Sequence, residues 1–210
     1  MSTKKKRPLH VTRTEASAVA GENAIWNVPN IITMVRLVLS IAVFVLIPLQ
    51  QYTAALVTFV VAASTDWMDG YWARKYGQVT KLGRVLDPFV DKIIICGTFI
   101  FLAAEQNSGI TAWMATVVMG REMLVTALRS VIEGSGGDFS AKWAGKIKMV
   151  VQCIAVVASL LVLRHLAIYK DTLPVEDWLK YSLLISAWGA IAITVYSGLE
   201  YVMIAARKMQ

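Results

Sequence analysis

The sequence contains few cysteines and few charged residues for its length. Its 210 residues include two cysteines, and 17% are charged, with 14 Asp and Glu against 21 Lys and Arg. Soluble domains average about 25% charged residues, and disordered chains carry more charge and fewer apolar residues. Cys96 and Cys153 stand alone within apolar runs, which favours core packing over a disulfide or a metal site. The composition therefore excludes an ordinary soluble domain, a disordered chain and a disulfide scaffold.

Apolar residues make up most of the chain, at 57%, and the mean hydropathy is +0.57. They fall into six runs, each close to the roughly 17–25 residues that cross a bilayer as a helix. The sequence therefore predicts an all-α fold, an integral membrane bundle of six transmembrane helices in one domain over residues 27–210. The predicted spans are about Ile31–Leu49, Tyr52–Trp72, Asp87–Ala104, Ile110–Ile132, Lys146–Leu163 and Tyr181–Ala205.

The distribution of Lys and Arg predicts the orientation of this bundle. Residues 1–26 contain the basic run Lys4–Arg7 and no apolar run, so they predict a disordered basic cytosolic tail rather than a secretory signal. With this tail inside, 18 of the 21 Lys and Arg lie in inside segments or the adjoining span ends, against three in outside connections. Basic residues favour the cytosolic side of a membrane, which places both termini in the cytosol.

Four aspartates lie at or just inside predicted membrane helix ends, where a carboxylate costs from roughly 2.5 kcal/mol upward. Asp66 and Asp69 share one helix face, as do Asp87 and Asp91, and a short basic segment separates the pairs. We expect the second and third helices to be antiparallel neighbours, so that the two faces meet at the cytosolic end. The carboxylates could share protons, pair with nearby Lys and Arg, or hold divalent cations such as Mg²⁺, Mn²⁺ or Ca²⁺.

Small and basic residues accompany these carboxylates at fixed spacing. Gly70 and Gly83 suggest close approach of a ligand or of another backbone, and Arg74 offers a planar fork suited to phosphate. The whole pattern is Asp66-x2-Asp69-Gly70-x2-Ala73-Arg74-x8-Gly83-x3-Asp87-x3-Asp91. It resembles the full signature of the CDP-alcohol phosphatidyltransferases, a family of six-helix, usually homodimeric membrane enzymes that depend on Mg²⁺ or Mn²⁺.

Within that family the chain is most similar to the phosphatidylglycerophosphate synthases, over roughly residues 27–160. The similar segments are Asn27–Arg36, Gly120–Arg129 and Ala144–Met149 with Gln152, although Met149 stands where those enzymes often carry Thr. The resemblance implies transfer of a phosphatidyl group from CDP-diacylglycerol to sn-glycerol 3-phosphate, with release of CMP. It also implies a homodimer in the plasma (inner) membrane, among membrane lipids, with its active site facing the cytosol and no role in binding nucleic acid.

The resemblance further implies a role for each motif residue. Asp66, Asp69, Asp87 and Asp91 hold the metal, expected to be two Mg²⁺ or Mn²⁺ ions, and Asp91 is also the general base for the acceptor hydroxyl. Gly70, Ala73, Arg74 and Gly83 shape the nucleotide and diphosphate site. Asn30 either touches the nucleotide or caps the first helix.

Glycerol 3-phosphate is a dianion, so its site requires basic residues near the metals. Arg121 and Lys146 are the first candidates and Arg129 and Lys148 the second, although basic side chains at a cytosolic helix end also extend simply toward the interface. Arg36 could bind phosphate or pair with one of the four aspartates; the sequence leaves both open.

Two rival functions remain compatible with the sequence. The same chemistry could use another acceptor: phosphatidylglycerol, as in a cardiolipin synthase, inositol phosphate, or serine, which the basic residues disfavour. The second rival is a small divalent-cation carrier. Carriers place ion sites near the membrane midplane, often between internal repeats, and this chain has neither feature.

Overall fold

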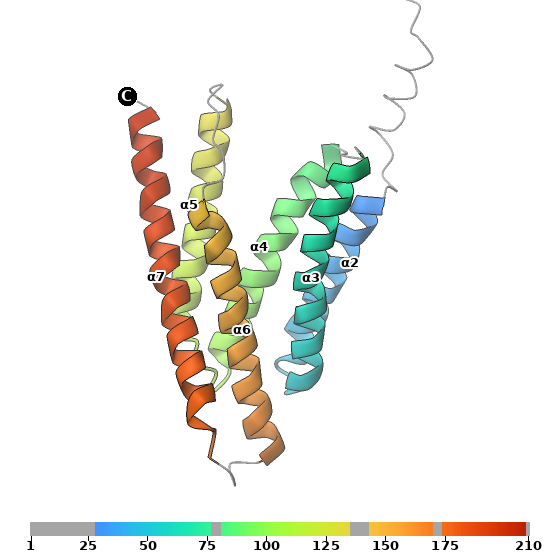
Figure 1. Ribbon diagram of the computed structural model, residues 1–210, viewed down its shortest axis with the longest axis vertical. Helices are drawn as coiled ribbons and strands as arrows, with labels where there is room; N and C mark the ends of the chain where they lie inside the picture. Colours follow the sequence, from blue (N-terminus) through green and yellow to red (C-terminus); the bar gives the residue numbers. More distant parts are fainter. Residues whose placement is uncertain (1–27, 77–80, 135–142, 170–173, 209–210) are drawn as a thin grey trace, which may run out of the picture.

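The computed structural model describes residues 28–76, 81–134, 143–169 and 174–208, with the side chains at 28–29, 66–76, 81–85, 87, 133–134, 143–144, 146 and 208 left out. All secondary structure in these ranges is helical, which confirms the all-α prediction (Figure 1). Six helices match the six predicted apolar runs. They are α2 Val28–Leu46, α3 Tyr52–Tyr76, α4 Lys81–Ala104, α5 Ala112–Gly134, α6 Trp143–Tyr169 and α7 Asp177–Lys208.

The helices are mostly longer than the apolar runs that predicted them. α4 begins at Lys81 rather than at Asp87, and α7 begins at Asp177 and continues to Lys208. Backbone hydrogen bonding continues a helix through polar residues, whereas hydropathy marks only the part that is apolar. The polar ends of the helices are therefore the part that the apolar pattern could not predict.

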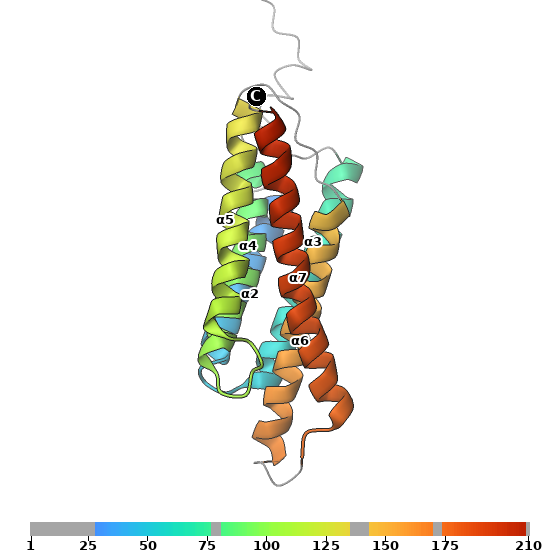
Figure 2. The same ribbon diagram turned by 90° about the vertical axis from the view of Figure 1, so that its left-hand side faces the viewer.

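Successive helices run in alternating directions along the long axis of the molecule. The starts of α2, α4 and α6 and the last turns of α3, α5 and α7 lie at one end, which we call the motif end (Figures 1 and 2). At the other end, the α2–α3 and α4–α5 connections turn through residues with positive φ, namely Gln50, Asn107 and Gly109. An even number of alternating helices brings the beginning of α2 and the end of α7 to the same end of the molecule.

α2 packs extensively against both α3 and α4. α7 packs mainly on α6 and α5, while α3 also contacts α6 and α4 also contacts α5. Over the described residues, α3 and α4 are not among the extensively packed pairs. The prediction that the aspartate-bearing faces of α3 and α4 meet stays a prediction, because most side chains at the end where the short connection joins these helices lie outside the described residues.

Two helices are long and apolar enough to cross a membrane, over Ile147–Tyr169 and Asp177–Arg207, counting the described residues only. In each of them 44% of the most apolar window is buried inside the protein, so more than half of that apolar surface faces outward. Asn30–Leu46 and Tyr52–Thr65 are shorter apolar helical stretches. Apolar surface on this scale is typical of a membrane protein, because water would make its exposure unfavourable.

The contact between α2 and α4 depends on a glycine. Gly97 lies against the ring of Phe44, and a Cβ at this position would overlap the outer edge of that ring. The ring cannot turn away freely, because it stacks on Phe101 with a centroid separation of 5.3 Å and an interplanar angle of 15°. The absence of a side chain at Gly97 therefore lets the two helices approach closely.

Replacing Gly97 by Ala is expected to destabilise the protein. The overlap with Phe44 costs about 1–3 kcal/mol, which exceeds the gain of up to about 1 kcal/mol in helix propensity. Thermal unfolding of the purified protein in detergent measures the effect as a lower Tm. Gly120→Ala is the matched control, because its Cβ would meet nothing within 4 Å. Equal Tm values for the two variants would contradict the packing argument.

Candidate functional site

The structure brings the backbone of the predicted aspartate motif to the motif end. Asp66 and Asp69 lie in the last three turns of α3, and Asp87 and Asp91 lie in the first three turns of α4. Only residues 77–80 separate these helices, so their ends are within about 19 Å of each other. At about 1.5 Å per residue, all four positions lie roughly 9–15 Å below the helix ends. The motif therefore occupies one level of the bundle.

Most side chains of the motif lie outside the described residues. Asp91 is the motif position whose side chain is described. The roles predicted for the other motif positions remain predictions, and these positions are Asp66, Asp69, Gly70, Ala73, Arg74, Gly83 and Asp87. The described side chains contain no group of three or more His, Cys, Asp or Glu residues placed to hold a metal. The side chains of Asp66, Asp69 and Asp87 are not among those described.

Asp91 pairs with Arg36 of α2. The Arg36 Nη1 atom donates to Asp91 Oδ1 at 2.6 Å, the arginine side chain is 2% exposed and the carboxylate is 29% exposed. Of the two roles that the sequence leaves open for Arg36, the structure shows the salt bridge. A buried guanidinium fixes the carboxylate in place by a charge-assisted hydrogen bond. Asp91 is thus held from the α2 side while remaining partly accessible.

A second charged group joins α5 and α6. Glu122 Oε1 accepts a close hydrogen bond from Lys148 Nζ and a second, at 3.3 Å, from Arg121 Nη1. The three side chains are each 8–10% exposed. Their formal charges add to one excess positive charge in a largely dry place. A buried excess charge is unfavourable unless a counterion joins it, so this cluster is suited to bind an anion.

Two further basic residues were predicted for this site, Arg129 and Lys146. Arg129 is two turns nearer the motif end on α5, and within the described chain its Nε is buried without a hydrogen-bond partner. The Lys146 side chain is not described. Asn30 is 3% exposed and lies inside the first turn of α2, which begins at Val28, so it does not occupy the position that precedes a helix and caps it.

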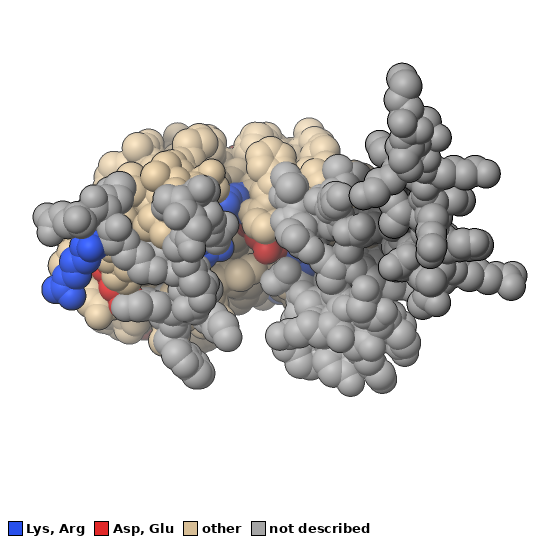
Figure 3. Space-filling view, turned by 90° about the horizontal axis from the view of Figure 1, so that it is seen from above, with Lys and Arg blue, Asp and Glu red and all other residues tan. Residues whose placement is uncertain are grey.

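α4 connects the two charged groups. Cys96 of α4 lies within electrostatic reach of Glu122 and Lys148, and it follows Asp91 by little more than one helical turn. Seen from the motif end, acidic and basic atoms lie in a hollow between the helices (Figure 3). α4 thus carries a carboxylate at Asp91 and, little more than one turn further on, faces the group of Arg121, Glu122 and Lys148, which we call the cationic group. A carboxylate that can accept a proton and a group that can hold an anion suit chemistry on a phosphate-bearing substrate.

Comparison with known proteins identifies the family. A family model described as CDP-alcohol phosphatidyltransferase matches residues 26–199. The chain belongs to the CDP-alcohol phosphatidyltransferase family. The match contains the whole Asp66–Asp91 pattern and both charged groups.

Individual members of the CDP-alcohol phosphatidyltransferase family are similar over nearly the whole chain. A Bacillus subtilis (strain 168) protein named CDP-diacylglycerol–glycerol-3-phosphate 3-phosphatidyltransferase is 36% identical over 192 residues, covering 84% of this chain and 93% of that protein. An Escherichia coli (strain K12) protein of the same name is 30% identical over 182 residues, with the same coverage. A Shigella flexneri serotype 5b protein of that name is also 30% identical.

Three residues of the cationic group and its surroundings were not predicted as site residues from the sequence. Glu122 is an acidic residue next to Arg121 inside an apolar helix. The sequence therefore shows that Glu122 is unusual, but it does not show that Lys148 is its partner. Gly198 and Tyr201 of α7 both lie against Arg121, and no motif marks them: a Cβ at Gly198 would be 3.1 Å from Arg121 Cγ, and the Tyr201 ring centroid is 5.3 Å from Arg121 Cζ.

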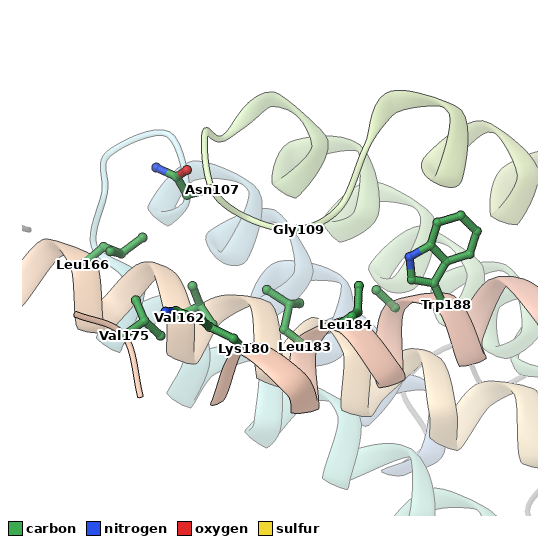
Figure 4. Close-up of a pocket in the computed structure, with 10 residues that line it drawn as sticks. Asn107, Gly109, Val162, Leu166, Val175, Lys180, Leu183, Leu184 and Trp188 are labelled. Atoms are coloured by element: carbon green, nitrogen blue, oxygen red, sulfur yellow. The ribbon is translucent and has the colours of Figure 1, made fainter. Parts of the chain in front are cut away.

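A cavity of about 440 Å³ lies at the opposite end of the molecule, between α6, α7 and the α4–α5 connection (Figure 4). Its walls are mainly apolar, with Lys180 and Asn107 as polar residues, and Figure 4 labels Leu166, Leu183 and Trp188 among them. None of the described residues that line it is an Asp or Glu. The described lining therefore offers no carboxylate, unlike the charged groups nearer the motif end.

Proposed function

We propose that this protein transfers the phosphatidyl group of CDP-diacylglycerol to sn-glycerol 3-phosphate and releases CMP. The observation that carries the proposal is the similarity to the Bacillus subtilis protein of that name, 36% identical over 84% of this chain. The acceptor hydroxyl attacks the lipid-side phosphorus, the phosphoanhydride bond breaks, and CMP leaves. Asp91 takes the proton of the attacking hydroxyl.

The cationic group supports a phosphorylated acceptor. Arg121 and Lys148 share one carboxylate and keep one excess positive charge between them, and we propose that this charge binds the phosphate of glycerol 3-phosphate. We assign Lys146 and Arg129 to the same site, as the resemblance implies. Glycerol 3-phosphate brings a phosphate dianion to this charge, whereas the phosphodiester of phosphatidylglycerol carries a single negative charge and serine carries no phosphate.

The acceptor is tested by giving purified protein CDP-diacylglycerol and Mg²⁺ together with one of several alcohols, while CMP release is measured. The expected result is CMP release with sn-glycerol 3-phosphate at a rate well above that with phosphatidylglycerol, inositol phosphate or serine. No CMP with any acceptor would overturn the transferase. Release with inositol phosphate alone would overturn the choice of glycerol 3-phosphate.

We also propose that Asp66, Asp69, Asp87 and Asp91 hold two Mg²⁺ ions, with Mn²⁺ as the alternative. The support is the donor chemistry: four carboxylates at one level of the motif end offer the oxygen ligands that Mg²⁺ prefers. A bound Mg²⁺ supplies positive charge that offsets the charge of the diphosphate. In this proposal Gly70, Ala73, Arg74 and Gly83 shape the nucleotide and diphosphate site and Asn30 touches the nucleotide.

Removing divalent metal is expected to lower CMP release at least about tenfold, because a metal contributes several kcal/mol of charge stabilisation. The measurement is CMP release after dialysis against a chelator, followed by addition of Mg²⁺, Mn²⁺ or Ca²⁺. Mg²⁺ or Mn²⁺ is expected to restore activity. Full activity in the chelated protein would rule out the metal proposal.

For the membrane arrangement, we propose that all six helices span the bilayer, with both termini and the motif end in the cytosol and the protein in the plasma (inner) membrane as a homodimer. Support comes from the even number of alternating helices and from the outward apolar surface of α6 and α7. Residues 1–26 form a cytosolic tail and residues 27–210 the catalytic domain. Labelling of single cysteines from either side of sealed vesicles tests the orientation, and the mass of the detergent-solubilised protein tests the dimer.

A further inference from the structure

Arg121 is held on three sides by side chains or backbone of α5 and α7. Its Nη1 donates to Glu122, its guanidinium carbon lies over the ring of Tyr201 at 5.3 Å from the centroid, and its stem passes Gly198. Tyr201 is 2% exposed and its hydroxyl lies beside Gly145 at the start of α6. The position of the guanidinium is thus set by α7 as much as by its own helix.

One edge of this guanidinium has no acceptor within the described residues. Arg121 Nε and Nη2 are both buried and neither makes a hydrogen bond there, whereas Nη1 is occupied by Glu122. The side chain is 9% exposed, so water does not readily replace the missing acceptor. Nε and Nη2 form the edge with which arginine binds a phosphate through two parallel hydrogen bonds. Buried donors left unpaired are unfavourable, and a bound phosphate removes that cost.

We propose that α7 forms the supporting wall of the acceptor-phosphate site, with Gly198 and Tyr201 as positioning residues that hold the Nε–Nη2 edge of Arg121 in place to bind phosphate. The inference rests on the proposed function, and it adds residues from a helix that carries no sequence motif. The Tyr201 ring attracts the Arg121 guanidinium through a cation–π contact, and the absence of a side chain at Gly198 leaves room for the aliphatic part of Arg121. Neither residue touches the substrate.

Gly198→Ala tests the proposal with the smallest change. The new Cβ would stand 3.1 Å from Arg121 Cγ, so the arginine stem has to shift by a few tenths of an ångström. Gly189→Ala on the same helix is the matched control, because its Cβ would meet Val151 at an ordinary 3.7 Å. Both changes alter helix propensity equally, so a difference between them reports on Arg121.

The expected result is a KM for sn-glycerol 3-phosphate at least about fivefold higher in Gly198→Ala, with the KM for CDP-diacylglycerol unchanged and Gly189→Ala like the wild type. Calorimetric binding of sn-glycerol 3-phosphate and of inorganic phosphate, without turnover, is expected to weaken by the same factor. Identical kinetics and binding in the two variants would overturn the role of α7.

A second pair of variants keeps the test decisive if Gly198→Ala fails to fold. Tyr201→Leu removes the ring and is expected to raise the same KM, while Tyr201→Phe keeps the ring and is expected to restore the affinity. A Tyr201→Leu protein with wild-type phosphate affinity would overturn the proposal. Failure of the wild type to release CMP would refute the proposed function alone, because the binding measurement still reports whether α7 positions Arg121.

Discussion

Asp91→Asn is expected to lower kcat at least about 10³-fold while the protein remains folded. General-base catalysis contributes about 10²–10⁴ in rate, and an amide can neither accept the proton of the acceptor hydroxyl nor offer a charged metal ligand. The substitution keeps the shape of the side chain, and its amide oxygen can still accept the hydrogen bond from Arg36 Nη1. Loss of the charge is expected to lower Tm without unfolding the protein, because Asp91 is 29% exposed and its pair with Arg36 is less deeply buried than that of Glu122 with Lys148. The measurements are kcat from CMP release and Tm in detergent.

The matched control is Asp177→Asn. Asp177 lies in the first turn of α7 at the opposite end of the molecule, where its side chain is 86% exposed and pairs with Lys180 at 3.7 Å. An exposed pair of this kind contributes at most about 1 kcal/mol, so this variant is expected to keep wild-type activity. Near-full activity in Asp91→Asn would show that the assignment of the base is wrong. Loss of activity together with loss of the folded state would place Asp91 in the structure rather than in the chemistry.

The apolar pattern predicted the number and kind of the described helices because each of them contains an apolar run of helical length. It could not predict that α2 packs against both α3 and α4, since the short connection at residues 77–80 fixes where two helix ends lie and does not determine the packing along the helices. The Arg36–Asp91 pair joins residues that are 55 positions apart. Whether the two side chains meet depends on how α2 and α4 are rotated about their own axes. The spacing of the aspartates alone left that pairing open.

The same limit applies to the cationic group. The sequence identified Arg121 and Lys148 as basic residues near the expected acceptor, and the structure places both on one carboxylate. Glu122 is visible as an isolated acid in an apolar helix, but its partner Lys148 lies 26 residues away on another helix. Gly198 and Tyr201 are ordinary residues for a membrane helix, so only the contact with Arg121 reveals them.

Glu122→Gln is expected to lower both stability and acceptor affinity, because the substitution leaves Lys148 as a buried cation without a carboxylate. Breaking a buried ion pair from one side costs about 3–5 kcal/mol, which is a large share of the stability of a small protein. The loss of an oriented Arg121 and Lys148 is expected to lower kcat/KM for sn-glycerol 3-phosphate at least about 100-fold. Intrinsic fluorescence of the seven tryptophans during heating measures the first effect, and CMP release measures the second.

A double variant separates the two effects of Glu122→Gln. Adding Lys148→Met removes the unpaired cation, so stability is expected to return toward the wild type, while the acceptor affinity stays low because the phosphate has lost a partner. Glu176→Gln is the control, since Glu176 is exposed beside Trp178 near the start of α7 and is expected to behave like the wild type. A double variant no more stable than Glu122→Gln would mean that Glu122 does not compensate the Lys148 charge. Recovery of acceptor affinity in the double variant would instead mean that Lys148 does not bind the phosphate, which would leave Arg121 as the described cation of the acceptor site.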